Sequence, residues 1–263
     1  MIDLTYIRGF FPPAIANNAL FQKHILKEYI ELMALEWLSC SVYSDKLVFI
    51  DGTNLRLIQG IDRFSEDLDF DCKHLCESEF IAMTDGLIQY LQLQGLQVVA
   101  KDKDGGVLKA YRRNVYFPEL LFSLQLTGHR EERFLMKIEA QDQGIDYPRE
   151  MATVQRMGFF YPVAVPPLAM LLSMKLSALL SRQKGRDFYD TLFLWQRTKP
   201  DFDFLQQRCG IGDMPTLMAA LQDMVAHTDL SLKRRDFEHL LFDPKKSEQI
   251  LHFMERLLPS ANV

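Results

Sequence analysis

The chain has 263 residues, of which 48% are hydrophobic and 25% charged, as is ordinary for a globular protein of one large or two small domains. A net charge of −5 argues against a generally basic nucleic-acid coat protein, although a local basic groove remains open. The four cysteines show no paired spacing, so we expect a reduced, cytosolic protein without a disulfide framework. We expect neither a signal peptide at the N-terminus nor a membrane span, because Pro166, Pro167 and Lys175 interrupt the longest apolar run.

The first elements in the chain surround a short turn. Apolar residues at helical spacing predict a helix from about residue 19 to 39, and the apolar run 47–50 predicts a buried strand. Gly52 and Thr53 then open a short helix through Ile58, with Thr53 as its expected N-cap. A second strand is expected over 67–71.

Further strands are expected before residue 140. The sequence predicts a helix over 77–93, a strand over 96–100, a hairpin turn at 105–106, and strands over 107–116 and 134–139. The segment 118–127 fits either a helix or a strand.

The character of the chain changes after Tyr147 and Pro148. Pro167 is well placed in the first turn of a helix that runs to about Arg182. Another helix is expected over 187–197, and the remainder to residue 258 is mostly helical. We therefore expect an α/β part over 1–149 and a mainly helical part over 150–263 that pack as one unit.

Two acidic residues lie two positions apart in the second strand. A strand points alternate side chains to one face, so Asp67 and Asp69 face the same way, with Cα atoms about 6.6 Å apart. Bare carboxylates at that range repel by roughly 2–3 kcal/mol at an effective dielectric near 20. Mg²⁺ binds through one or two carboxylates plus substrate phosphates, so the pair predicts a metal site for phosphate chemistry. The alternative is a solvated strand edge, to which we assign the neighbouring acids Asp62, Glu66 and Asp71.

The turn before this strand adds groups that suit a phosphate. Gly52 allows close approach of the backbone, and Thr53 with the first amides of the short helix can donate hydrogen bonds. Glu139, on the strand 134–139, is a candidate third carboxylate that positions the metal or accepts a proton. Pairing of Glu139 with Lys137 is the equally weighted structural alternative.

A basic cluster accompanies the helical part. Lys175 interrupts an apolar helix, and a lysine on a buried face is costly without an anionic partner. Arg182 and Arg186 follow, and these residue types recognise triphosphates. The structural alternative has Lys175 extending to solvent and Arg186 paired with Asp190. The sequence leaves Asp187 and Asp190 open as the acid of this region.

The segment Asp51-Gly52-Thr53-Asn54-Leu55, followed by residues 63–70 and later by 175–190, resembles the motifs of AbiEii/AbiGii-type nucleotidyltransferases. These are toxins of abortive-infection toxin–antitoxin pairs within the DNA polymerase β-like superfamily. The resemblance implies an α+β fold: a polymerase β-like core, in which helices flank a mixed sheet, plus a helical C-terminal half. It also implies Mg²⁺-dependent transfer of a nucleotide from an NTP, in some relatives to tRNA, and an antitoxin protein as a partner.

Carried over by position, the resemblance assigns metal binding to Asp67 and Asp69, with Glu139 as the third carboxylate. It also has Gly52 and Thr53 hold phosphate, Lys175 contact the nucleotide and Asp187 complete the catalytic set. Apart from the resemblance, we add Ser65, Arg182 and Arg186 as candidate nucleotide-binding residues. Two departures stand out: the family usually has Gly where this chain has Asp51, and a small residue where it has Asn54. An acid at position 51 would repel a triphosphate if it turned inward.

These residues predict a nucleotidyltransferase that modifies an RNA or protein hydroxyl. The basic clusters 109–113 and 233–235 are candidate contacts for an RNA backbone, although a run of charge is more often a solvated face. A non-catalytic nucleotide- or partner-binding protein and a metal-dependent nuclease remain the alternatives. Product analysis separates them, because a nuclease shortens RNA and a transferase lengthens it.

Overall fold

The computed structural model describes residues 2–101 and 110–258. The chain divides into two compact units, each described by itself below. The first unit comprises Met1–Ile58, Phe64–Gly144 and Arg149–Val165, and the second comprises Gln59–Arg63, Ile145–Pro148 and Pro166–Val263. The hairpin turn expected at residues 105–106 and the first residues of the strand expected from 107 lie outside the described part of the chain.

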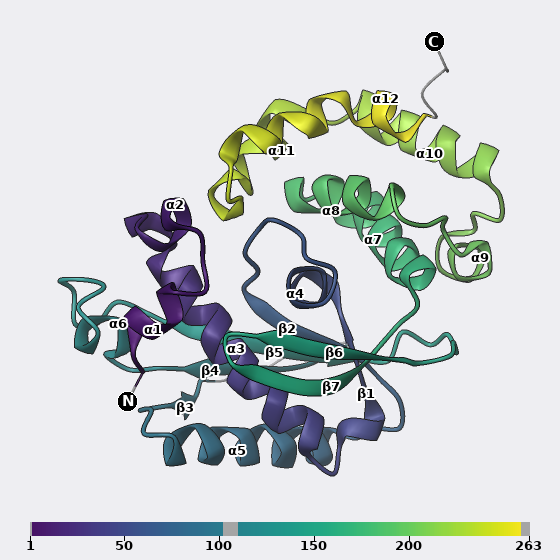
Figure 1. Cartoon of the computed structure of the whole chain (residues 1–263). Helices are drawn as coiled ribbons and strands as arrows, with labels where there is room; N and C mark the ends of the chain where they lie inside the picture. Colours follow the sequence, from purple (N-terminus) through teal and green to yellow (C-terminus); the bar gives the residue numbers. More distant parts are fainter. Residues whose placement is uncertain (1, 102–109, 259–263) are drawn as a thin grey trace. The chain divides into compact units, whose positions relative to one another are not determined.

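A five-stranded mixed sheet is the centre of the first unit (Figure 1). Its order is β1-β2-β5-β4-β3; β2 and β5 are parallel and the other neighbours are antiparallel. The strands are β1 (Leu47–Ile50), β2 (Asp67–Cys72), β3 (Val99–Ala100), β4 (Tyr111–Tyr116) and β5 (Leu135–Gln141).

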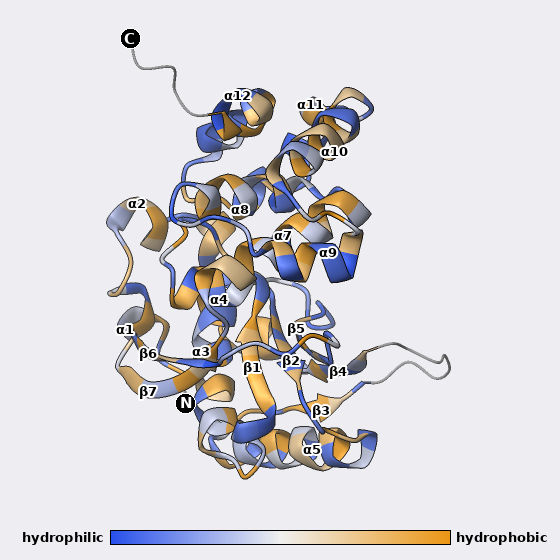
Figure 2. Cartoon of the chain, turned by 90° about the vertical axis from the view of Figure 1, so that its right-hand side faces the viewer, coloured by the Kyte–Doolittle hydropathy of each residue, from blue (hydrophilic) through white to orange (hydrophobic). Residues whose placement is uncertain are grey.

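The burial of the central strands follows from their sequence patterns. β1 is apolar along its length, as its colour in Figure 2 shows, and Leu47, Val48 and Phe49 are buried. In β5 every second residue is buried, so Lys137 and Glu139 share the opposite face, as expected. β2 alternates in the same way at its start, where Asp67 and Asp69 flank the buried Leu68.

Helices complete the first unit. The elements are α1 (Leu4–Arg8), α2 (Pro13–Ala16), the 3₁₀ turn η1 (Ala19–Phe21), α3 (Gln22–Cys40), η2 (Ser44–Lys46), α4 (Asp51–Leu57), α5 (Glu77–Leu93) and α6 (Leu120–Ser123). α5 has the bounds that the sequence predicted; it begins with a capping box between Cys76 and Glu79, and Gly95 follows it at φ +84°. The ambiguous segment 118–127 contains the short α6.

A two-stranded hairpin, β6 (Glu150–Arg156) paired with β7 (Phe159–Val165), also belongs to the first unit. The sequence analysis assigned residues 150–165 to the mainly helical part and did not expect these strands. Their turn lies at Met157 and Gly158, both at positive φ. Buried Val154 and Tyr161 anchor the hairpin, and the Tyr161 hydroxyl donates to the Leu32 carbonyl of α3.

The second unit is helical, as expected. Its elements are α7 (Leu168–Arg182), α8 (Gly185–Trp195), α9 (Phe202–Cys209), α10 (Met214–Ala226), α11 (Leu230–Arg235), η3 (Glu238–Leu240), η4 (Pro244–His252) and α12 (Phe253–Leu257). Gln183 ends α7 in a left-handed conformation, and α8 then begins at the buried Gly185. A Cβ atom at Gly185 would lie 1.8 Å from the Lys233 carbonyl oxygen, so only glycine fits where α8 meets α11.

The α+β prediction, with a mixed sheet and flanking helices, is confirmed. Within the described residues, none of the helices combines the length and the apolar character needed to cross a bilayer. One assignment to the surface was wrong: Asp71 is 1% exposed, and its carboxylate accepts a hydrogen bond from the Gln143 backbone at 2.9 Å.

Candidate functional site

The turn between β1 and α4 begins the candidate site. Asp51 follows β1 directly and has φ +61°, a left-handed conformation that glycine adopts without strain and that Asp tolerates better than most residues. This conformation explains why glycine suits position 51. Asn54 holds the helix to the strand by donating from Nδ2 to the Phe49 carbonyl at 2.7 Å.

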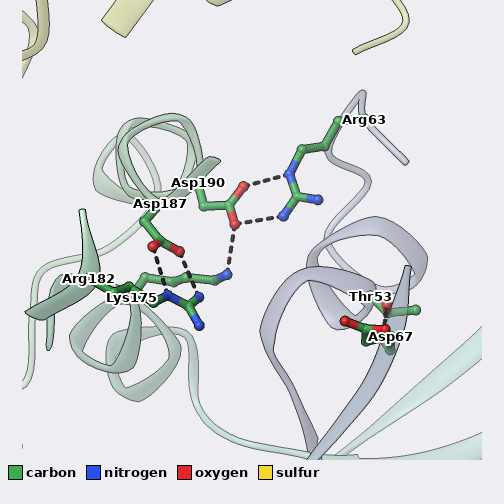
Figure 3. Close-up of polar contacts among 7 residues, drawn as sticks. All are labelled: Thr53, Arg63, Asp67, Lys175, Arg182, Asp187 and Asp190. Atoms are coloured by element: carbon green, nitrogen blue, oxygen red, sulfur yellow. Dashed lines mark hydrogen bonds and ion pairs between the residues drawn. The ribbon is translucent and has the colours of Figure 1, made fainter. Parts of the chain in front are cut away.

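Thr53 has a different local role from the one predicted. α4 begins at Asp51 and has no side-chain cap, so the expectation that Thr53 is the N-cap was wrong. Thr53 lies within the helix and is buried, and its hydroxyl donates to the backbone oxygen of Asp67. The bond joins the turn to the start of β2, so this hydroxyl positions Asp67 (Figure 3).

The carboxylates of Asp67 and Asp69 lie on one face of β2, as their spacing predicted. The register pairs Asp69 with Ile50 of β1 on one side and with Glu139 of β5 on the other. Asp67 pairs with Lys137 of β5, whose Nζ lies 2.9 Å from the Asp67 carboxylate. Both acids are half-buried and lie in the first half of β2, where Thr53 of α4 contacts the Asp67 backbone.

Negative charge accumulates around Asp69. Burial, followed by the charges of Asp51, Asp67 and Glu139, raises the pKa of Asp69 well above its ordinary value, and Lys137 opposes the shift. Burial lowers the pKa of Lys137, but its hydrogen bond to Asp67 and the nearby carboxylate charges outweigh that effect and leave it raised. The acids therefore hold Lys137 as an ammonium ion, which partly offsets their repulsion.

Glu139 pairs with Lys137, as the structural alternative to metal binding proposed. Its carboxylate lies 3.5 Å from Lys137 Nζ and forms an ion pair with Arg112, its register partner on β4. These contacts neutralise Glu139 locally, so its role as a third metal ligand stays a prediction.

The carboxylates of Asp67 and Asp69 fit a divalent cation whose remaining ligands come from the substrate. No group of three or more His, Cys, Asp or Glu side chains in the described residues is arranged to hold a metal by protein ligands alone. Asp67 and Asp69 nevertheless present two carboxylates on one face, and the Lys137 ammonium already acts as a stand-in cation at Asp67. Mg²⁺ is commonly bound by two carboxylates, with phosphates and water filling the remaining positions.

Two groups beside the acids remain suitable for phosphate. Gly52 is buried in the first turn of α4, where helical backbone amides lack intrahelical partners. Ser65 is 8% exposed, and its hydroxyl has no hydrogen-bond partner within the part of the chain that the structure describes. Ser65 is thus the better-placed hydroxyl donor, because that of Thr53 is already used.

Lys175, in the second unit, is committed to a buried ion network (Figure 3). Its Nζ lies 2.7 Å from the Asp190 carboxylate, which also accepts from Arg63 Nε and Nη2 at 2.7 and 2.6 Å. Burial raises the pKa of Asp190, but the charges of Arg63 and Lys175 outweigh it and lower the pKa overall. All three side chains are at most 3% exposed. The alternative in which Lys175 extends to solvent was therefore wrong.

Asp187 and Asp190 have separate partners. Asp187 is buried and accepts two hydrogen bonds from Arg182, at 2.9 and 2.8 Å. The Arg182 side chain is 36% exposed. Arg186 is half-buried and has no carboxylate partner among the residues described, so its suggested pairing with Asp190 does not form. Arg186 is the basic residue of this cluster whose charge remains available.

Sequence reasoning missed two residues and one electrostatic effect. Arg63 was seen in the motif but given no role, because its partner Asp190 lies 127 positions away. The influence of Asp51 on Asp69 depends on the β1–β2 register. Glu31 of α3 is 1% exposed and its Oε1 has no hydrogen-bond partner in the described chain.

Glu31, on α3, is surrounded by acidic residues. Burial raises its pKa well above the ordinary value; Lys27 opposes the shift, whereas the charges of Glu28, Asp67 and Glu66 add to it. Burial therefore favours the protonated form of Glu31 more strongly than that of an exposed glutamic acid. Nothing in its sequence context separates it from Glu28, which instead forms ion pairs with Arg56 and Arg156.

Comparison with known proteins gives one family match. The sequence profile of the family described as "Nucleotidyl transferase AbiEii toxin, Type IV TA system" matches residues 33–262. No protein of curated function matches the chain by sequence.

The fold is shared with solved structures. One is MenT4, the nucleotidyltransferase toxin Rv2826c from Mycobacterium tuberculosis H37Rv, with a TM-score of 0.60 at 16% identity, over 98% of this chain and 100% of that one. Another is JHP933 from Helicobacter pylori, with a TM-score of 0.53 at 20% identity, over 89% of this chain and 90% of that one. At these identities the likeness establishes a common fold.

Proposed function

Because the chain belongs to the AbiEii family of nucleotidyltransferase toxins, we propose that it moves a nucleotide from an NTP to a hydroxyl of RNA, with Mg²⁺. The observation that supports this most is the same-face placement of Asp67 and Asp69 beside the turn at Gly52. tRNA is the first acceptor to test, and a protein hydroxyl is the second. The family's type IV toxin–antitoxin description also supports an antitoxin partner.

Asp67 and Asp69 are the proposed metal ligands, and Glu139 would join them only if it left Lys137 and Arg112. The metal, when bound, offsets charge on the triphosphate and favours displacement at phosphorus. Gly52 and Ser65 are the proposed phosphate contacts, and Thr53 positions Asp67 through its hydroxyl. Lys137 would partly offset the charge of Asp67 in the absence of the metal.

In the second unit, some residues are proposed to contact the substrate and others to support the fold. Arg186 is the proposed contact for an anionic group of the substrate, because its charge has no carboxylate partner in the described residues. Arg182 is half-exposed and is held by Asp187, so a substrate anion could reach its guanidinium from the solvent side. For Lys175 the supported role is neutralisation of Asp190, which makes a direct nucleotide contact the weaker proposal.

The test is transfer of label from each of the four [α-³²P]NTPs to total RNA or to protein. We expect Asp67→Asn and Asp69→Asn to lose more than about 100-fold of the transfer rate, because losing a metal-binding carboxylate weakens the hold on a metal that would stabilise the transition state by several kcal/mol. Both variants should stay folded, because each substitution removes repulsion from the acidic face. Glu66→Gln, in the same segment but out of phase with the pair, is the matched control and should retain transfer.

Full activity in both aspartate variants would refute the proposal. Nucleotide binding without transfer to any acceptor would favour a binding protein, and shortened RNA would indicate a nuclease.

A further inference from the structure

Asp51 is the residue of the acidic face for which neither the family pattern nor the proposed mechanism has a use. It sits where β1 becomes α4, one residue after Ile50, and Ile50 is the register partner of Asp69. The residue that follows it is Gly52, the proposed phosphate contact. Sequence order and register therefore place Asp51 next to both the acid pair and the phosphate-binding turn.

The backbone at Asp51 also needs an explanation. Its φ of +61° is one that glycine adopts freely. A residue with a side chain adopts this φ at a conformational cost, and Asp51 bears that cost. The charge of Asp51 is felt inside the site, since it follows burial as the leading cause of the raised Asp69 pKa, ahead of Asp67 and Glu139. The register and this charge effect together place the Asp51 charge close to Asp69.

We propose that Asp51 makes nucleotide binding depend on the divalent cation, because its charge repels a triphosphate from Gly52 until the metal offsets it. This inference rests on the proposed function. Without metal, the triphosphate would meet the negative charges of Asp51, Asp67 and Asp69. The Lys137 ammonium, which pairs with Asp67, offsets only part of this charge. With metal bound to Asp67 and Asp69, the repulsion from Asp51 is largely cancelled. Asp51 thus acts as a specificity residue that selects the metal-bound nucleotide over the free one.

The experiment compares nucleotide affinity with and without metal. Calorimetric titration with the α,β-methylene analogues of the four NTPs, which prevent turnover, gives Kd in Mg²⁺ and in EDTA. For the wild type we expect a large ratio between the two values. In Asp51→Asn the ratio should fall by about tenfold, mainly through tighter binding in EDTA, because one charge within several ångströms of a phosphate is removed.

Two further variants separate charge from backbone. Asp51→Gly removes the charge and relaxes the positive φ, so it should match Asp51→Asn if charge is the cause. Glu66→Gln removes a nearby acid outside the pair and should keep the wild-type ratio.

Three results would overturn the inference. The first is an unchanged ratio in Asp51→Asn, and the second is a change in Asp51→Gly only. The third is a loss of more than about tenfold in Mn²⁺ affinity of Asp51→Asn without nucleotide, which would make Asp51 a metal ligand. Absence of transfer in the labelled-NTP assay, with analogue binding retained, would reject the proposed function and leave this inference standing; absence of binding in every variant would reject both.

Discussion

Removing the charge of Asp190 should destabilise the second unit strongly. Asp190 accepts three hydrogen bonds from two cations, at 2.6 to 2.7 Å, and is fully buried together with Arg63 and Lys175. Asp190→Asn removes the anion that Arg63 and Lys175 share, and breaking a buried ion pair by removing one partner typically costs about 3–5 kcal/mol. For a chain of this length the loss corresponds to a decrease in Tm of about 6–20 °C.

Urea and thermal unfolding followed by circular dichroism would measure this loss. Lys175→Met leaves Asp190 with both of its bonds to Arg63, so it should cost clearly less. Asp203→Asn, at an exposed acid on α9, is the matched control and should stay within about 0.5 kcal/mol of the wild type. A loss below about 1 kcal/mol for Asp190→Asn would refute the reasoning that the network holds this unit together.

The same variant has a defined pH dependence. The folded-state pKa of Asp190 lies below its ordinary value of 3.8, so its contribution to stability is present above pH 3.8 and is lost as the pH falls through the folded-state pKa. The stability difference between the wild type and Asp190→Asn should therefore be constant near neutral pH and shrink in acid.

Two other substitutions test features that the sequence did not reveal. The raised pKa of Glu31 means that its contribution to stability is present below pH 4.5 and is lost as the pH rises through the folded-state pKa. In urea unfolding, Glu31→Gln should accordingly be more stable than the wild type at pH 8, by a margin that shrinks toward pH 4.5. A wild type that is equally or more stable at pH 8 would contradict the raised pKa of Glu31. Gly185→Ala should cost more than about 2 kcal/mol, because the new Cβ meets the Lys233 carbonyl, whereas Gly128→Ala has open space and should be neutral; equal Tm values would contradict this packing.

Local patterns predicted much of the first unit. The apolar run of β1, the alternation in β2 and β5 and the helical periodicity of α5 each depend on neighbours in sequence, so periodicity and capping were sufficient to find them. The β6–β7 hairpin was missed. Its exposed Met151 and Phe160 break the alternation that identifies a half-buried strand, and the stabilising contact of Tyr161 is with Leu32, more than a hundred positions away.

The motif residues show the same division. The spacing of Asp67 and Asp69 decided by itself that both carboxylates share a face, because a strand alternates whatever it pairs with. Which charges surround them depended on the sheet register, which brings Lys137 and Glu139 from β5 and places Ile50, just before Asp51, opposite Asp69.

The sequence alone determined the family resemblance, the α+β class and the shared face of the acid pair, because these follow from local order. Tertiary structure alone decided that Asp190 is shared by Lys175 and Arg63 and that Arg112 and Lys137 hold Glu139. It also decided that Glu31 is buried with its Oε1 atom unpaired among the described residues. The physical reason is that the charge state and availability of a side chain depend on burial and on partners that the fold brings from distant positions.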